Sequence, residues 1–98
     1  MGVATTSAYS ASKAALWGLS KVISTENAKK NITSNVINLG YFNIGMIKDV
    51  PAFSLQAIKG SIPSGSLGNP DNILNTINYI VESEYLTGSE INLNGSIH

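Results

Sequence analysis

The sequence predicts an α/β fold in the order helix, strand, flap, helix, strand. Helical periodicity marks residues 7–30 and 70–84, and two short β-leaning segments that end in glycine mark residues 32–39 and 89–93. A strand, a crossover that contains helices and a second strand make a parallel pair. Two strands alone are rarely stable, and parallel sheets are covered on both faces. We therefore expect the C-terminal part of a larger, doubly wound parallel sheet, without its N-terminal strands.

The first helix is predicted over residues 7–30, a stretch rich in Ala, Leu and Lys that contains no Pro. Thr5, Thr6 or Ser7 is expected to cap its start, while Lys29, Lys30 and Asn31 suit its C-terminal end. Its apolar residues recur at helical intervals, at Ala8, Ala11, Ala15, Leu19, Val22 and Ile23. One side of the helix consists mainly of Ala, Ser and Gly, so close packing by another element is expected there.

The segment after the first strand is predicted to form a mobile helical flap over residues 43–60. Gly45 and Pro51 interrupt it before a helical run over 52–59. In a complete enzyme its apolar residues would cover a substrate, although ordinary packing explains them equally well. These residues are Met46, Ile47, Val50, Phe53 and Leu55.

The last third of the chain is predicted to form a linker, a helix and a strand. The Ser- and Gly-containing residues 61–69 are interpreted as a flexible linker. Pro70 and Asp71 open a helix over 70–84, whose apolar side is expected to hold Ile73, Ile77, Ile80 and Val81. A turn at Thr87-Gly88 then leads into the second strand, which Asn94-Gly95 closes.

Composition excludes several functional classes. The 98 residues amount to at most one domain, and six Lys balance six acidic residues without any Arg, which disfavours nucleic-acid binding. The chain has no Cys, and its only His is the terminal His98, so no metal site is expected. No apolar run approaches the roughly 20 residues that span a bilayer, and we expect no membrane association and a cytoplasmic location.

Four ordered motifs carry a resemblance to a known family. Tyr9-Ser-Ala-Ser-Lys13 resembles the Tyr-x-x-x-Lys motif and small-residue helix of the classical short-chain dehydrogenases/reductases. Asn31 to Phe42 resembles the strand and Pro-Gly turn that follow, with Leu39 in place of Pro. Leu67 to Ile73, and Tyr85 to Gly95, resemble the entry to the last helix and the final strand. Together the motifs span nearly the whole chain, which is most like the 3-oxoacyl-carrier-protein reductase group.

The resemblance implies a Rossmann-like fold and an NAD(P)-dependent interconversion of carbonyl and alcohol. In the family, the Tyr donates a proton and the Lys holds the nicotinamide ribose, roles that fall to Tyr9 and Lys13. Four residues apart on a helix, the two side chains share one face, and a cation beside a phenol favours the phenolate. Cofactor contacts are implied for Lys13 and for the turn at Gly40, Tyr41 and Phe42. These motifs occur in sugar, steroid and alcohol members alike and do not specify the substrate.

Three departures from the family pattern make activity of the isolated chain doubtful. The family's catalytic Ser would fall before Met1, and Ser7, Ser10 and Ser12 lie too near Tyr9 to replace it. The Gly-rich turn that binds the pyrophosphate has no counterpart, because Gly60, Gly65 and Gly68 lack the strand-turn-helix context. Ile44 stands where a cofactor-contacting Thr is expected.

Three functional hypotheses remain after this comparison. The favoured one is the C-terminal half of a dehydrogenase, inactive by itself. The second is the catalytic half of a split enzyme, in which another polypeptide supplies the missing N-terminal half with the dinucleotide site. The third is an interaction module that forms homo-oligomers through its first helix and an unpaired strand edge.

Overall fold

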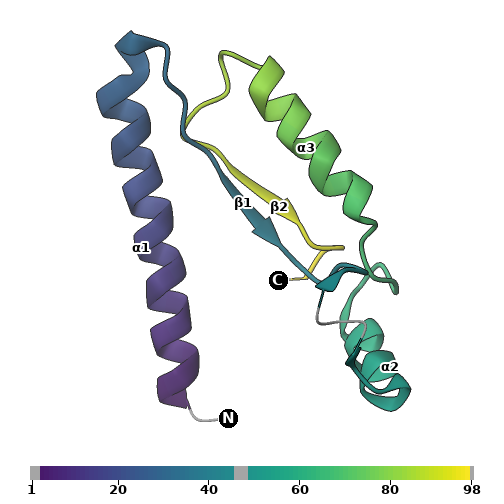
Figure 1. Cartoon of the computed structure of the whole chain (residues 1–98). Coiled ribbons are helices and arrows are strands. Elements are labelled where there is room, and N and C mark those ends of the chain that lie inside the picture. The colour runs from purple at the N-terminus through teal and green to yellow at the C-terminus, as the bar shows by residue number, and fades with distance from the viewer. Residues whose placement is uncertain (1–2, 46–48, 98) are drawn as a thin grey trace. The chain divides into compact units, whose positions relative to one another are not determined.

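A computed structural model of the chain describes residues 3–45 and 49–97. Its elements are α1 (Val3–Asn27), a 3₁₀ turn η1 (Ala28–Lys30), β1 (Val36–Leu39), α2 (Ala52–Ser61), α3 (Pro70–Glu82) and β2 (Glu90–Leu93) (Figure 1). The chain is a small α/β structure, as the sequence predicted. It divides into two compact units, Met1–Val36 with Ser83–Glu90, and Ile37–Glu82 with Ile91–His98.

Helix α1 begins earlier than its sequence indicated. It starts at Val3, so Thr5, Thr6 and Ser7 lie inside the helix and the prediction that one of them caps it is wrong. The helix-forming residues downstream outweigh the small propensity cost of Thr and Ser. Helix α1 ends at Asn27, three residues before the predicted end, and η1 continues to Lys30. Asn31, which was expected to end the helix, adopts a left-handed conformation with φ 61°.

The first unit is packed through small polar residues of α1. Ser20 and Ser24 are buried, and the hydroxyls of Ser20 and Ser34 are hydrogen-bonded at 2.8 Å. A Cβ atom at Gly88 would lie 2.9 Å from Oγ of Ser24, so glycine permits this close approach. The larger apolar side chains of the helix are exposed: Leu16, Leu19, Val22 and Ile23. The close packing expected along the small face is not seen at Gly18, whose Cβ position has no described atom within 4 Å.

Strands β1 and β2 pair in parallel (Figure 1). The amide of Val36 donates to the carbonyl of Ser89 at 2.9 Å, and that of Gly40 donates to Leu93 at 3.1 Å. The second bond lies four residues further along both strands, which is the register of a parallel pair. Asn38 donates to Asn92 across the pair at 2.8 Å. Both strands are shorter than predicted, because polar side chains bind the backbone at their entrances.

Asn35 is the main residue at these entrances. Its amide nitrogen donates to the carbonyl of Leu86, and its amide oxygen accepts the N–H of Ser89, both at 3.1 Å. Next to it, the backbone N–H of Ser34 donates to the hydroxyl of Thr87 at 3.1 Å. Side chains therefore satisfy backbone groups that would otherwise extend the ladder.

The core of the second unit is small. Phe42 and Ile62 are the buried hydrophobic residues within the described part of the chain. Ile62 belongs to the segment 61–69 that the sequence analysis interpreted as a flexible linker. That interpretation is wrong, because Ser64 donates to the carbonyl of Gly95 at 3.1 Å and Gly68 donates to that of Tyr41 at 2.8 Å. Backbone hydrogen bonds therefore connect the segment 61–69 to the residues that follow β1 and β2.

Helix α3 packs through only part of the face that its pattern indicated, at Ile73 and Ile80. Ile73, Thr76 and Ile80 are half-buried, whereas Ile77 is exposed and Val81 is 73% exposed. Pro70 occupies its first position, and Oδ1 of Asn69 accepts the N–H of Asp71 at 2.9 Å. The helix ends at Glu82, before the predicted residue 84, and Leu86 donates to the carbonyl of Ser83 in the turn that follows.

The segment predicted as a flap contains α2. Leu55 and Ile58 are half-buried, while Phe53 is 87% exposed and contributes little to packing. Met46 and Ile47, which were expected to face a substrate, lie outside the described residues. Within the described ranges, neither α1 nor any other helix combines the length and the apolar character needed to cross a membrane.

Candidate active-site residues

Tyr9 and Lys13 lie together on one face of α1. The Nζ atom of Lys13 is 5.0 Å from the centroid of the Tyr9 ring, within the range of a cation–π contact. The helix produces this arrangement directly, since side chains four residues apart are neighbours on its surface. The pair predicted from the motif spacing is therefore present as a pair, with its charged group against the phenol.

The surroundings of this pair are open to water. Tyr9 is 61% exposed, and Lys13 is exposed as well. Water screens the attraction between a cation and an aromatic ring and weakens the effect of the ammonium on the hydroxyl. A proton relay of this kind needs further walls that exclude water before its electrostatics become strong.

A second pair of the same kind follows on α1. Nζ of Lys21 lies 5.0 Å from the centroid of the Trp17 ring, and the partners are again four positions apart in the sequence. The sequence analysis did not single out this pair, although the same spacing rule would have found it. Because Trp17 has no hydroxyl, the second pair shows that the geometry alone does not define catalysis. It provides an internal control for the first.

The predicted cofactor contact at Gly40 has a structural reason to be glycine. A Cβ atom there would lie 2.7 Å from both Cα and Cβ of Asn94. The amide of Gly40 is already used in the bond to Leu93. Glycine is needed at this position so that β1 can pass the end of β2, whether or not a cofactor binds nearby.

Tyr41 and Phe42 continue from Gly40 along an extended segment that pairs with Gly68. The carbonyl of Tyr41 accepts from Gly68 at 2.8 Å, and the amide of Asn43 donates to the carbonyl of Gly68 at 3.0 Å. In a parallel bridge of this kind, the N–H and C=O of Phe42 point away from Gly68. The carbonyl of Phe42 accepts from Ile44 at 2.8 Å, while its N–H finds no acceptor among residues 3–45 and 49–97.

This unpaired donor is the observation that fits a nicotinamide cofactor. Phe42 is only 8% exposed, and a buried N–H without an acceptor is costly, so an added carbonyl oxygen would stabilise it. A carboxamide supplies such an oxygen. The hydroxyl of Tyr9 and the ammonium of Lys13 are groups that can hydrogen-bond a ribose. In the second unit, Phe42 therefore suits a carboxamide, and in the first unit, Tyr9 and Lys13 suit a ribose hydroxyl.

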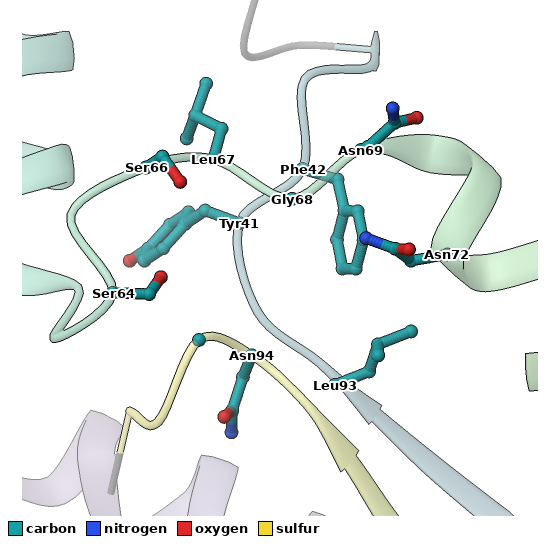
Figure 2. Close-up of a pocket in the computed structure, with 11 residues that line it drawn as sticks. Tyr41, Phe42, Ser64, Ser66, Leu67, Gly68, Asn69, Asn72, Leu93 and Asn94 are labelled. Atoms are coloured by element: carbon teal, nitrogen blue, oxygen red, sulfur yellow. The ribbon is translucent and has the colours of Figure 1, made fainter.

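A pocket in the second unit adds residues that the sequence analysis did not connect. It has a volume of about 360 Å³ and lies beside Tyr41 and Phe42 (Figure 2). The segment 64–69, the start of α3 and the end of β2 complete its walls. The parallel bridge between Phe42 and Gly68 and the hydrogen bond from Ser64 to Gly95 bring these segments together, and no spacing in the sequence encodes these contacts.

Comparison with known proteins identifies the family. All of residues 1–98 match the family described as enoyl-(acyl carrier protein) reductase. The chain belongs to the short-chain dehydrogenases/reductases and is similar to their 3-oxoacyl-acyl-carrier-protein reductases. This agrees with the resemblance seen in the four sequence motifs.

Of the three relatives described next, two carry the name of a reductase and one is a nodulation protein. The chain is 37% identical to nodulation protein G of Azospirillum brasilense over 92 residues, 92% of this chain and 37% of that protein. It is 39% identical to acetoacetyl-CoA reductase of Shinella zoogloeoides over 90 residues, 89% of this chain and 37% of that protein. It is 32% identical to 3-oxoacyl-acyl-carrier-protein reductase of Escherichia coli over 92 residues, 92% of this chain and 38% of that protein. The chain thus spans less than half the length of these relatives.

Proposed function

We propose that this chain is the C-terminal, Tyr–Lys-bearing part of an NAD(P)-dependent oxidoreductase that interconverts a carbonyl and an alcohol, and that it is inactive by itself. The observation that carries the proposal is the Tyr9–Lys13 pair, with Nζ of Lys13 5.0 Å from the phenol ring. The pair lies in a chain whose full length matches a reductase family.

The chemistry assigns one task to each of the two residues. A bound nicotinamide supplies the hydride that reduces the carbonyl carbon. The hydroxyl of Tyr9 donates its proton to the carbonyl oxygen, and the ammonium of Lys13 stabilises the negative charge left on the phenol. In the second unit, the N–H of Phe42 would donate to the carboxamide oxygen of such a cofactor. In the direction of oxidation, Tyr9 accepts the proton from the alcohol.

Two features support inactivity of the isolated chain. Tyr9 is 61% exposed, so the described residues do not provide the water-excluding site that acid–base and hydride chemistry require. The sequence also contains no Gly-rich turn between a strand and a helix that could bind a pyrophosphate. In the split-enzyme version of the proposal, a second polypeptide supplies both the water-excluding walls around Tyr9 and the Gly-rich turn that binds the pyrophosphate.

The experiment compares the chain alone with the chain completed by an N-terminal half. Calorimetry with NADH and NADPH, and circular dichroism on the same sample, test whether the isolated chain folds and binds cofactor. Co-expression with the part of the Escherichia coli reductase that precedes the matched region then tests for carbonyl reduction. We expect no turnover from the chain alone and measurable turnover from the complex.

The two aromatic–lysine pairs of α1 provide the matched controls. In the complex, Tyr9→Phe should lower kcat by about 100-fold or more, because the proton donor is lost. Lys13→Met should also be severely impaired, whereas Lys21→Met should retain activity. Turnover by the purified 98-residue chain that disappears in Tyr9→Phe would contradict the proposed inactivity. A complex that forms but shows equal activity in Tyr9→Phe would contradict the role of Tyr9.

The second candidate is a self-associating interaction module, and the exposed apolar residues favour it. Leu16, Leu19 and Ile23, which are three and four positions apart on α1, are all exposed. Contiguous exposed apolar surface marks an interaction site. Light scattering over a range of concentrations should show oligomers, with dissociation in Leu16→Glu or Leu19→Glu. A monodisperse monomer at high concentration would eliminate this candidate.

A further inference from the structure

We propose that the pocket beside Tyr41 and Phe42 binds an uncharged small molecule that carries several hydroxyl or amide groups, such as a neutral sugar. The proposal concerns the side chains of the second unit, so it stands or falls independently of the Tyr9–Lys13 chemistry. The pocket has a volume of about 360 Å³, which lies within the range of ligand-binding sites.

Backbone hydrogen bonds form the pocket before any ligand arrives. Gly68 donates to Tyr41, and Ser64 donates to Gly95 at 3.1 Å. The two glycines have a role here, because a Cβ at Gly68 would meet the Phe42 ring, and one at Gly95 would lie 2.5 Å from Oγ of Ser64. Gly95 also has φ 64°, a conformation that side chains disfavour. A site held by such contacts loses little entropy when it binds.

The walls of the pocket carry polar and apolar groups on both sides of the chain at Tyr41 and Phe42 (Figure 2). One side has the hydroxyls of Tyr41, Ser64 and Ser66 with Leu67, and the other has the Phe42 ring and Leu93 with the amide of Asn72. Because Tyr41 and Phe42 are adjacent in an extended segment, their side chains point to opposite sides. A ligand with hydrogen-bonding groups on a compact carbon frame matches both sides.

The free hydrogen-bonding groups are neutral. Asn94 is already committed to Ile97 and Ser96, and Oδ1 of Asn69 accepts from Asp71. The hydroxyls of Tyr41, Ser64 and Ser66 and the amide of Asn72 make no hydrogen bond to another side chain or backbone group of the described chain. Each can donate and accept.

Charge selects against ionised ligands. Among residues 3–45 and 49–97, no Lys, Asp, Glu or His lines the pocket. An ion that enters loses hydration without gaining an opposite charge, which is unfavourable. The adjacent start of α3 does not attract an anion, because its first turn already carries the carboxylate of Asp71.

The test uses three probes on one sugar frame: N-acetylglucosamine, which is neutral, glucosamine, which is cationic, and glucuronate, which is anionic. Two-dimensional ¹H–¹⁵N NMR of the whole chain reports binding residue by residue. We expect the neutral probe to shift the amide signals of residues 64–68 and of Asn94 and Gly95 at millimolar concentration. The charged probes should bind about tenfold more weakly, because their charge is unpaired in the site.

Matched variants separate the pocket from general surface binding. Ser64→Ala with Ser66→Ala should weaken binding of N-acetylglucosamine by about fivefold or more, because two hydrogen bonds are lost. Ser54→Ala, on α2 and outside the pocket, should leave it unchanged. Shifts outside the pocket, equal binding of glucuronate, or an unaffected double variant would overturn the proposal. A spectrum without dispersed signals would also overturn it, since the pocket requires three folded segments.

Discussion

Phe42 and Gly68 face each other across a parallel bridge, and a Cβ atom at Gly68 would lie 2.5 Å from Cε1 of the Phe42 ring. This contact joins the turn after β1 to the segment before α3. It buries Phe42, which together with Ile62 makes up the buried hydrophobic residues in the described part of the second unit. The stability of that unit therefore depends on the absence of a side chain at Gly68.

The first prediction concerns the lack of a side chain at Gly68. Gly68→Ala should lower the free energy of unfolding by about 1–3 kcal/mol, because an added methyl group would displace the Phe42 ring. Gly60→Ala is the matched control. Its Cβ position in α2 has no described atom within 4 Å, so this change should be neutral or stabilise by up to about 1 kcal/mol. Urea unfolding followed by circular dichroism measures both, and equal effects would contradict the packing argument.

The second prediction concerns the turn at Gly40. Gly40→Ala should destabilise the chain, because its Cβ would lie 2.7 Å from backbone and side-chain carbons of Asn94. We expect a loss of about 1–3 kcal/mol. Gly18→Ala, in the open middle of α1, should instead stabilise by about 1 kcal/mol. Thermal unfolding of both variants tests this prediction. A melting temperature for Gly40→Ala that is not below that of Gly18→Ala would contradict the steric argument.

The third prediction concerns the polar packing of α1. Ser20→Ala should cost about 1 kcal/mol, since Ser20 is buried and its hydroxyl bonds that of Ser34 at 2.8 Å. Ser34→Ala should cost a similar amount. The double variant should cost less than the sum, with a coupling of about 0.5–1 kcal/mol measured by a double-mutant cycle. Additive losses would show that the hydroxyls do not interact.

The fourth prediction concerns the entrance to the strands. Asn35→Asp keeps an acceptor for the N–H of Ser89 and loses the donor to Leu86. Asn35→Ala loses both hydrogen bonds. The unfolding free energy should therefore fall more in Asn35→Ala, by about 1–3 kcal/mol, than in Asn35→Asp at neutral pH. Hydrogen exchange at Ser89 should accelerate only in Asn35→Ala, and unchanged protection there would contradict the assigned bond.

The sequence predicted the elements whose signals are local. The helical period of the first segment and its termination near Asn31 were readable, because neighbours along the chain determine both. The Tyr9–Lys13 pair was also readable, since four-residue spacing places two side chains together on any helix. The pairing of two short strands around a helical crossover followed from their order.

The contacts between distant segments required the tertiary structure. The pattern placed Val81 on the packed side of α3, yet Thr76 is half-buried and Val81 is exposed, because the neighbouring segments decide which face is covered. The segment 61–69 looked like a linker because Ser, Gly and Pro mark turns equally well in mobile and in fixed loops. Its bonds to Tyr41 and Gly95 fix it and create the pocket.

The sequence by itself determined the family, the order of the elements and the helical placement of Tyr9 beside Lys13, because each depends on residues close together in the chain or on motifs in a fixed order. Only the tertiary structure decided that Gly68 accommodates Phe42, that Gly40 accommodates Asn94, and that a neutral pocket lies beside them. These are close approaches between residues far apart in sequence, and their steric fit exists only after the segments have packed.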